Sequence, residues 1–404
     1  MNILLINTFY YPTIIGGAEI SVQKLAEGLV KNGHNVSVVC TDKEDKYEIL
    51  NGVQVFRIKI KNMYDPIESQ KQGIIRKSIY RIIDLYNIFN YKRLREIFIK
   101  VKPDVVHTNN TYGISPVIWS VSKKLNVPIV HTLRDYYLMY PYGNLTNSES
   151  GKSLLNIYEK LHKSFHRFIS SKVNYVTAPS KFTLDKFIEK DFFYKSQKKV
   201  IFNAIDFNKN TIDQWYANKI SKTNNKVTKF VYLGTLGEHK GVHILLNAFH
   251  EIEDNHIELH IAGKGTLQNM VEEFEQKDSR IKYHGFLQGE NLEKLLLQCD
   301  VLLAPSVWYE PFGRVVIDGY KHALMVIGSS SGGLAEIIKD GKTGLLIEPN
   351  SSESLKLGIN KLKKSENKEQ LLINCREELN TFSIEKQIKD FETIYYSLIS
   401  KYKL

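Results

Sequence analysis

The chain has 404 residues, 43% of them hydrophobic and 25% charged, which is typical of a globular protein long enough for two domains. It has no run of the ~18 consecutive apolar residues that a membrane span needs, and its three cysteines fit neither a disulfide framework nor a metal site. The formal net charge of +11 favours an anionic partner, either anionic lipid or a phosphorylated substrate; since no nucleic-acid-binding motif occurs, we expect no nucleic-acid partner. We expect a cytoplasmic protein with reduced thiols.

The first residues lack the basic segment of a signal peptide and predict a strand at 3–6, buried on both faces. Gly16 and Gly17 then precede a predicted helix. Glycines at a helix start let a phosphate approach the backbone, although an ordinary strand–helix turn explains them equally well. The pair is not the G-x-G-x-x-G fingerprint, which disfavours a nicotinamide site and a nicotinamide oxidoreductase.

Strand and helix signals alternate through residues 36–39, 53–58, 104–107 and 129–131, a pattern typical of a doubly wound parallel sheet. Polar residues stand at the carboxyl ends of the last two of these strands, where open α/β sheets bind ligands. These are His107, Arg134, Asp135 and Tyr136. A local ion pair between Arg134 and Asp135 is the structural alternative to a role in binding.

Residues 74–100 are predicted to be helical, and seven Arg and Lys residues lie among Ile, Leu and Phe from 76 to 100. Two interpretations of this basic amphipathic stretch remain open. Its apolar side packs on the sheet while its charges are solvated, or it makes peripheral contact with an anionic membrane at the inner face of the cell.

Strand and helix signals also alternate in the second half of the chain. A strand at 230–233 leads into a glycine-rich loop that contains Thr235 and Lys240 and then into a helix, which is a second anion site in form. Further strands precede the turn at Gly263 and the segment ending at Phe286.

The most informative stretch follows the strand at 301–304. Its loop carries Glu310, and Pro311 and Gly313 mark the start of a helix that contains Asp318. Neither carboxylate is needed for folding, so both are candidate ligand-binding groups. The alternative is that Asp318 only pairs with Arg314, four residues earlier, for about 0.2–0.5 kcal/mol.

Residues 305–313 read Pro-Ser-x-Trp-x-Glu-Pro-Phe-Gly, and together with Asp318 they resemble the E-x7-E signature of glycosyltransferase family 4, retaining enzymes that use nucleotide-sugars. Asp318 is one methylene shorter than the family's second acid. The segment 131–136 resembles the family's His-Thr-Leu-His-Asp-Tyr, with Arg134 in place of the second His, and Thr235 stands where the family often has arginine.

The resemblance implies an α/β GT-B fold of two Rossmann-like doubly wound parallel-sheet domains facing across a cleft. The expected domains are 1–205, completed by a helix at about 384–404, and 206–383. Implied roles are catalysis for Glu310, Arg134 and Asp135, and acceptor binding for His107 and Tyr136. The implied donor-binding residues are Gly16, Gly17, Thr235, Lys240, Gly263, Phe286, Phe312, Gly313, Arg314 and Asp318.

The implied reaction moves a sugar from a UDP- or GDP-sugar to a glycan or lipid-linked glycan in cell-envelope polysaccharide synthesis. We find no D-x-D pair to hold a divalent metal, so we expect no metal and no cofactor, the nucleotide-sugar being a substrate. Two alternatives remain. The departures at Arg134 and Thr235 leave room for a non-catalytic nucleotide-sugar-binding scaffold; a nucleotide-sugar epimerase would need no acceptor, but the Glu310/Asp318 signature argues against it.

Overall fold

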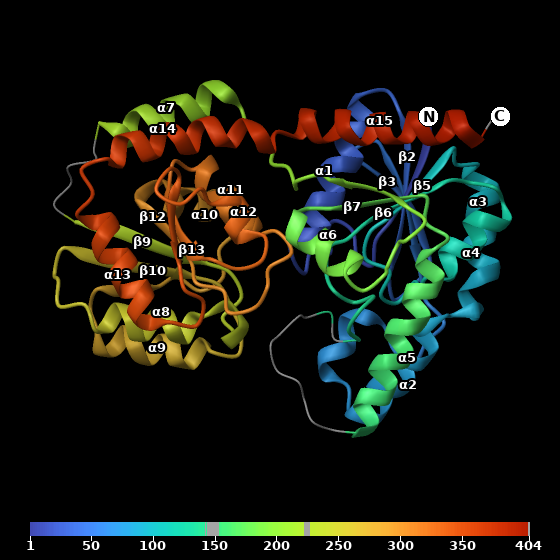
Figure 1. Ribbon diagram of the computed structural model, residues 1–404, viewed down its shortest axis with the longest axis horizontal. Helices are drawn as coiled ribbons and strands as arrows, with labels where there is room; N and C mark the ends of the chain where they lie inside the picture. Colours follow the sequence, from blue (N-terminus) through green and yellow to red (C-terminus); the bar gives the residue numbers. More distant parts are fainter. Residues whose placement is uncertain (142, 144–152, 222–226, 403–404) are drawn as a thin grey trace. The chain divides into compact units, whose positions relative to one another are not determined.

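The computed structural model describes residues 1–141, 143, 153–221 and 227–402, which form two compact units (Figure 1). The N-terminal unit consists of Met1–Ala204 and Ile384–Leu404, and the C-terminal unit of Ile205–Ser383. The chain therefore leaves the first unit, forms the second and returns to the first with its last helix. None of the helices in the described ranges is both long enough and apolar enough to cross a membrane.

The N-terminal unit contains an eight-stranded sheet in the order β3-β4-β2-β1-β5-β6-β7-β8. All neighbours are parallel except β3 and β4, which form an antiparallel hairpin at the edge. The inner strands are almost entirely buried, because both faces of the sheet are covered. The strands are β1 (Asn2–Ile6), β2 (Asn35–Thr41), β3 (Lys46–Leu50), β4 (Val53–Ile58), β5 (Val105–Thr108), β6 (Ile129–Thr132), β7 (Tyr175–Ala178) and β8 (Gln197–Val200).

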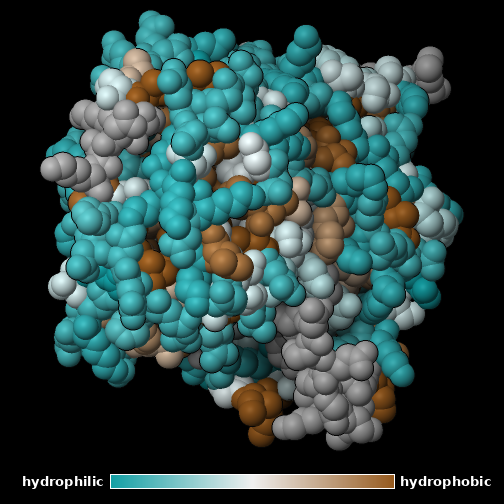
Figure 2. Space-filling view, turned by 60° about the vertical axis from the view of Figure 1, so that its left-hand side comes forward, coloured by the Kyte–Doolittle hydropathy of each residue, from teal (hydrophilic) through white to brown (hydrophobic). Residues whose placement is uncertain are grey.

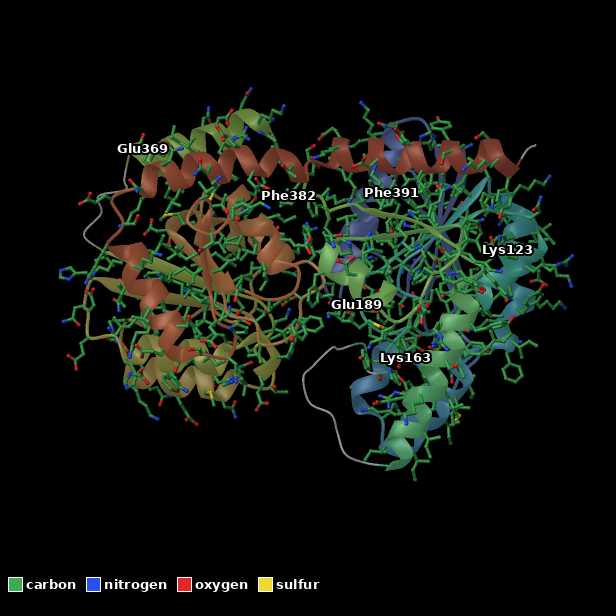
Figure 3. All side chains as sticks on the ribbon, viewed as in Figure 1. Lys123, Lys163, Glu189, Glu369, Phe382 and Phe391 are labelled. Atoms are coloured by element: carbon green, nitrogen blue, oxygen red, sulfur yellow. The ribbon has the colours of Figure 1, made fainter. Side chains whose placement is uncertain are left out.

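Two helices of this unit, one from each end of the chain, pack closely together. A Cβ added at Gly28 on α1 would lie 2.3 Å from Ile388 on α15, and Phe391 of α15 belongs to the same apolar core as the first strands (Figure 3). The helices are α1 (Gly17–Lys31), η1 (Pro66–Lys71), α2 (Ile74–Leu85), η2 (Ile88–Asn90), α3 (Tyr91–Val101), α4 (Val117–Lys124), α5 (Ser153–Ser170), α6 (Lys181–Ile188) and α15 (Ile384–Tyr402).

The C-terminal unit contains a six-stranded, entirely parallel sheet in the order β11-β10-β9-β12-β13-β14. The strands are β9 (Thr228–Leu233), β10 (Ile257–Ala262), β11 (Ile281–Tyr283), β12 (Val301–Ala304), β13 (Met325–Ser329) and β14 (Gly344–Ile347). The helices are α7 (Lys209–Ile220), η3 (Glu238–Lys240), α8 (Val242–His250), α9 (Gln268–Lys277), α10 (Gly289–Gln298), α11 (Arg314–Lys321), α12 (Leu334–Ile337), α13 (Ser352–Lys363), α14 (Lys368–Leu379) and η4 (Asn380–Phe382). Two α/β domains built on parallel sheets confirm the predicted fold class.

The prediction of one long helix over 74–100 was wrong, because the helix breaks between α2 and α3. Tyr86 has a non-helical backbone, with φ −153° and ψ 82°. The next residue, Asn87, is held by other segments: its N–H donates to Ser115 Oγ at 2.8 Å and its side-chain amide donates to the Lys61 carbonyl at 2.9 Å. These bonds replace the helical ladder at the break.

Candidate functional site

In the C-terminal unit, the strand order reverses between β9 and β12, which marks the place where open α/β sheets bind ligands. The loops that leave the carboxyl ends of these two strands are bonded to each other. The backbone N–H groups of Val307 and Trp308 both donate to the His239 carbonyl, at 3.0 and 3.2 Å. The two loops therefore form one local structure.

Their close approach requires a glycine. Gly241 has φ +73°, and a Cβ at this position would lie 1.9 Å from the Pro305 carbonyl oxygen. A third loop, after β13, approaches in the same way: a Cβ on Gly332 would lie 2.6 Å from the Glu310 carbonyl oxygen, and the Gly333 N–H donates to that oxygen at 2.7 Å. Only glycine avoids these backbone clashes.

The centre of this loop cluster is an ion pair. Lys240 Nζ lies 2.5 Å from Glu310 Oε1, and the Ser306 hydroxyl donates to the same oxygen at 2.8 Å. The Lys240 ammonium also stands 5.1 Å from the centroid of the Trp308 ring. The Glu310 side chain is only 12% exposed, and the contacts with Lys240 and Ser306 fix the orientation of its carboxylate.

The pKa of Glu310 reflects this setting. Burial by itself raises the pKa of a carboxyl, but the charge and hydrogen bond of Lys240, together with the hydrogen bonds of Ser306 and Trp308, bring it below its ordinary value. Glu310 is therefore ionised at neutral pH and can accept hydrogen bonds from hydroxyl groups.

Helix α11 begins beside this pair. Gly313, at φ +97°, precedes its first residue, so the positive end of the helix dipole is directed at the same sheet edge. Four residues into the helix, Asp318 Oδ2 lies 3.9 Å from Arg314 Nε, the separation expected of a weak surface pair. The Phe312 side chain is buried against Phe382, so its ring is not accessible to a ligand at this sheet edge.

The other expected donor residues follow neighbouring strands. Thr235 is exposed after β9, and its carbonyl accepts the Tyr232 hydroxyl hydrogen at 2.7 Å. Gly263 after β10 is packed on that loop, since a Cβ there would lie 1.8 Å from the Gly234 carbonyl oxygen. Phe286 is exposed, with Lys264 Nζ 4.7 Å from its ring centroid. All three thus lie at the carboxyl side of the sheet.

In the N-terminal unit, the strand order reverses between β1 and β5. The loops after these strands are joined by two bonds, from Thr8 Oγ1 to the Tyr112 carbonyl at 2.9 Å and from the Asn110 N–H to Asn7 Oδ1 at 3.1 Å. The first of these loops ends at Gly16, whose N–H donates to Glu19 Oε2 at 2.8 Å. Glu19 thereby fixes the end of the loop at the start of α1.

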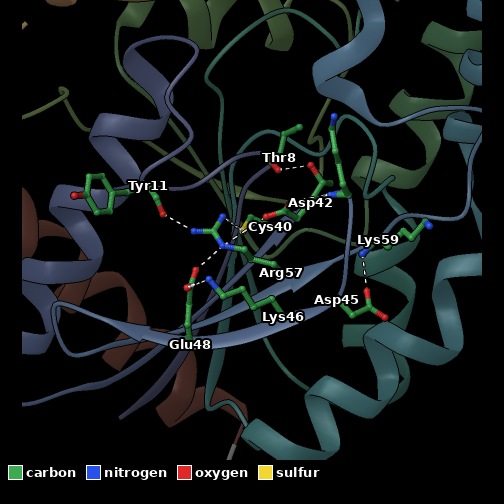
Figure 4. A network of polar contacts seen from close by, with 11 residues as sticks. Thr8, Tyr11, Cys40, Asp42, Asp45, Lys46, Glu48, Arg57 and Lys59 are labelled. Carbon is green, nitrogen blue, oxygen red and sulfur yellow. Dashed lines mark hydrogen bonds and ion pairs between the residues drawn. The ribbon is translucent and has the colours of Figure 1, made fainter.

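A buried arginine holds the same loop nearer its start (Figure 4). Arg57 of β4 is only 4% exposed, and its guanidinium donates to the Tyr11 carbonyl at 2.6 Å. It also donates to Glu48 Oε1 at 2.5 Å and contacts Cys40 Sγ at 3.7 Å. The loop that carries Gly16 and Gly17 is therefore anchored at both ends.

Arg134 and Asp135 follow β6. The Arg134 guanidinium donates to Asn109 Oδ1 at 3.0 Å and also to Asn203. Asp135 Oδ1 accepts the Tyr137 N–H at 2.9 Å. Burial raises the pKa of Asp135 to about 6, with the charge of Glu19 acting in the same direction and the Tyr137 N–H opposing it. A carboxylate with a pKa close to neutral is suited to exchange a proton with a hydroxyl.

The two residues expected to bind an acceptor, His107 and Tyr136, are fully buried. His107 Nδ1 lies 2.6 Å from the Tyr395 hydroxyl, and its Nε2 lies 2.6 Å from Thr132 Oγ1. Burial, and then the charge of Arg134, lower the pKa of His107 well below its ordinary value, so the ring is neutral. The Tyr136 ring stacks on Phe187. Both side chains are enclosed by other protein groups, so the structure does not support the prediction that they contact an acceptor directly.

Sequence reasoning missed several residues that hold the candidate site together. They are Glu19, Arg57, His239, Ser306 and Gly332. Gly332 could have been identified, because glycines between a strand and an apolar helix mark a third helix start at the same sheet edge. Arg57 gave no signal of its own, since it is one of two polar residues in the strand over 53–58.

Comparisons with known proteins cover both units. The family described as glycosyl transferases group 1 matches residues 213–378, and glycosyltransferase family 4 matches residues 15–209. An uncharacterized 42.6 kDa protein in the cps region of Klebsiella pneumoniae is 32% identical over 83% of this chain and 87% of its own length. An uncharacterized glycosyltransferase of Methanocaldococcus jannaschii is 26% identical over 90% of this chain and 89% of its own.

Solved structures agree on the fold. Sucrose-phosphate synthase from Thermosynechococcus elongatus superposes with a TM-score of 0.74 at 19% identity, covering 99% of each chain. HepE from Anabaena, solved in complex with UDP, gives 0.69 at 18% identity, covering 98% of this chain and 100% of its own. The chain is a glycosyltransferase with a GT-B fold, and it belongs to the group 1 glycosyltransferases.

Proposed function

We propose that the chain is a retaining glycosyltransferase that moves a sugar from a UDP- or GDP-sugar to a glycan or lipid-linked glycan. The ion pair between Lys240 and Glu310 is the observation that supports this most directly. It brings a cation suited to a diphosphate and an ionised carboxylate suited to sugar hydroxyls to the point where the sheet order reverses.

On the donor side, Glu310 accepts hydrogen bonds from hydroxyls of the transferred sugar, and Asp318 from the ribose hydroxyls. Lys240, the N-terminus of α11 and the backbone at Phe312 and Gly313 hold the diphosphate and the sugar. Charged hydrogen bonds of this kind contribute about 1.5–3 kcal/mol each, so a few suffice to stabilise the charge on a departing diphosphate. We therefore propose that transfer needs neither a metal nor a cofactor.

On the acceptor side, Asp135 is the proposed base. The bond between the sugar C1 and the diphosphate oxygen breaks, an oxocarbenium-like state forms, and the acceptor oxygen bonds to C1 on the face that the diphosphate leaves. The hydroxyl proton passes to Asp135. Arg134 stabilises negative charge nearby, and the anchored Gly16–Gly17 loop contacts the diphosphate.

The biological setting is also a proposal. The Klebsiella pneumoniae relative lies in a cps region, and HepE was solved with UDP, which supports cell-envelope polysaccharide synthesis and a uridine nucleotide. A lipid-linked acceptor would bring the chain to the inner face of a membrane as a peripheral protein.

The first test is a thermal-shift panel of UDP-, GDP- and ADP-sugars with the full chain, with and without EDTA, and with Glu310→Ala. A ligand at about 100 times its Kd stabilises the folded state by about 2.7 kcal/mol, enough for a visible shift. We expect one nucleotide series to shift the melting temperature, EDTA to leave that shift unchanged, and Glu310→Ala to lose the preference for a particular sugar. A folded sample that responds to no nucleotide would overturn the proposal.

Turnover then separates the remaining alternatives. With a glycan acceptor, the anomeric configuration of the product, followed by NMR, should match that of the donor; an inverted product would refute retention. Donor consumption without any acceptor would favour an epimerase. Binding without turnover across an acceptor panel would favour the scaffold.

A further inference from the structure

Helices α2 and α5 lie side by side in the N-terminal unit (Figure 1), and each buries titratable side chains while it exposes a stripe of large apolar ones. On α2 the buried residues are Tyr80 and Asp84, and among the described side chains of α5 the buried ones are His162, His166, Ile169 and Ser170. A surface helix of a globular protein usually does the opposite and packs its apolar stripe on the core.

The inward orientation is fixed by specific contacts. The Asp84 carboxylate accepts the Tyr137 hydroxyl hydrogen at 2.5 Å and the Gly113 N–H at 3.0 Å. The Tyr137 ring lies 5.3 Å from the ring of His162 and 5.8 Å from that of His166, measured between centroids. One buried tyrosine therefore contacts the inward face of both helices, and neither helix can rotate without breaking this cluster.

The outward face carries large apolar side chains at helical spacing. On α2, Ile75, Ile79 and Ile82 are 77, 40 and 61% exposed. On α5, Leu161 and Phe168 are 62 and 70% exposed, with Ile157 one turn before them. On α2 the buried pair stands five and nine positions after Ile75, and on α5 the two histidines stand five and nine positions after Ile157, in each case on the opposite side of the helix. Brown side chains stand at the lower edge of Figure 2, the end where Figure 1 places these helices.

Positive charge surrounds these apolar stripes. The only acidic residue of α2 is the buried Asp84, and the described side chains of α5 include one acid, Glu159. Lys163 is labelled on α5 in Figure 3. The basic residues of the two helices are Arg76, Lys77, Arg81, Lys160, Lys163 and Arg167.

We propose that this face, defined by Ile75, Ile79, Ile82, Ile157, Leu161 and Phe168, docks on the surface of an anionic lipid bilayer. Apolar side chains flanked by Lys and Arg are the composition that lets a helix lie in the headgroup region, where each basic residue contributes about 1 kcal/mol. Helix α3 is not part of this face. The proposed surface therefore differs from the basic stretch that the sequence predicted over 76–100, which includes α3.

A second copy of the chain fits the face less well. In a symmetric dimer the same patch meets itself, so the basic residues of both helices would face their own counterparts. Like charges placed opposite one another oppose such a contact, whereas an anionic surface neutralises them. The occupant is therefore anionic and extended, as a bilayer is.

The inference rests on the proposed function in one respect: a membrane-bound acceptor gives the docking a purpose. The test does not depend on it. The full chain is sedimented with vesicles of phosphatidylcholine alone and with vesicles that also contain phosphatidylglycerol, and Ile82→Ser/Leu161→Ser is compared with Ile99→Ser, an exposed isoleucine of α3 that serves as the matched control.

We expect the chain and Ile99→Ser to bind the anionic vesicles only, with binding that weakens as salt is raised, and Ile82→Ser/Leu161→Ser to bind about tenfold or more weakly. Equal melting temperatures show that the variants are folded, and the chain's nucleotide-induced thermal shift reports separately on the donor site. Undiminished binding by the double variant, or no binding of the folded chain to anionic vesicles, would overturn the inference. A concentration-dependent dimer abolished by the same two substitutions would assign the face to a second copy instead.

Discussion

The Lys240 ammonium lies 2.5 Å from Glu310 Oε1, although the two residues are 70 positions apart in the chain. In our proposal Lys240 meets the donor diphosphate and Glu310 meets the donor sugar, so without donor each group neutralises the other. Donor binding then offers the lysine a second anion and the carboxylate a set of hydroxyl donors. The pair keeps both side chains ordered before the substrate arrives.

Lys240→Met is therefore expected to change the ionisation of Glu310 as well as donor binding. The pKa of Glu310 is below its ordinary value, so its ion pair stabilises the fold above about pH 4.5 and this contribution is lost as the pH falls through the lowered pKa. Without Lys240, burial dominates and the pKa rises, so the acidic limb of the kcat/KM profile should move to higher pH, with a fall in kcat/KM of about tenfold or more.

Lys294→Met is the control, because this lysine is 71% exposed in the same unit. It should leave the pH profile unchanged. An acidic limb in Lys240→Met at the same pH as in the unmodified chain would contradict the assigned coupling.

Asp135→Asn is expected to make the protein more stable and less active. The pKa of Asp135 is raised to about 6, so the folded state holds this proton more tightly than the unfolded state does. Its contribution to stability is therefore present at acidic pH and is lost as the pH rises from about 4 to about 6. At pH 7 the charged carboxylate costs at most about 3 kcal/mol, and asparagine removes this cost while it still accepts the Tyr137 N–H.

Urea unfolding at pH 5 and pH 7, together with steady-state turnover, checks this expectation. The exposed Asp191→Asn serves as the control in the same unit, since its side chain is 81% exposed. A variant stabilised at pH 7 with full activity would show that Asp135 is not the base. A destabilised variant would show that its charge supports the fold.

The strands were the part of the fold most accessible from sequence. The expected strand over 53–58 coincides with β4, because its apolar residues are all β-branched or aromatic and a turn signal precedes them. The preceding strand β3 was missed, although Asn51 and Gly52, with φ of +51° and +81°, form the two-residue turn of its hairpin with β4. This Asn-Gly pair is the sequence signal that could have predicted the hairpin.

The candidate site was only partly predictable. A local motif identified Glu310, and a glycine-rich loop pointed to Lys240, but their contact depends on which strands are neighbours in the sheet. The burial of His107 was not predictable either, because Tyr395, which bonds its ring, lies 288 positions further along the chain. Periodicity within one segment carries no information on such long-range packing.

Arg57→Met is expected to destabilise the protein by about 1–3 kcal/mol, since it leaves the Tyr11 carbonyl without its buried donor and Glu48 with Lys46 as its remaining partner. If the Gly16–Gly17 loop contacts the diphosphate, the variant should also raise the KM for the donor. The matched control is Lys46→Met: Lys46 pairs with the same carboxylate but is 60% exposed, so its loss should cost at most about 1 kcal/mol. Denaturant unfolding and donor kinetics measure both effects, and equal losses in the two variants would refute the anchoring role.

Tyr395→Phe tests how α15 holds the interior of the N-terminal unit. The Tyr395 hydroxyl lies 2.6 Å from His107 Nδ1, and both residues are fully buried. Phenylalanine keeps the ring but leaves the imidazole nitrogen without a partner, which should cost about 1–3 kcal/mol in the free energy of unfolding. Tyr396→Phe alters the neighbouring residue, which is 55% exposed, and should change that free energy by less than about 0.5 kcal/mol. Urea unfolding of the two variants measures this difference. If Tyr395→Phe proved as stable as Tyr396→Phe, the hydrogen bond between His107 and Tyr395 would not contribute to holding the imidazole in place.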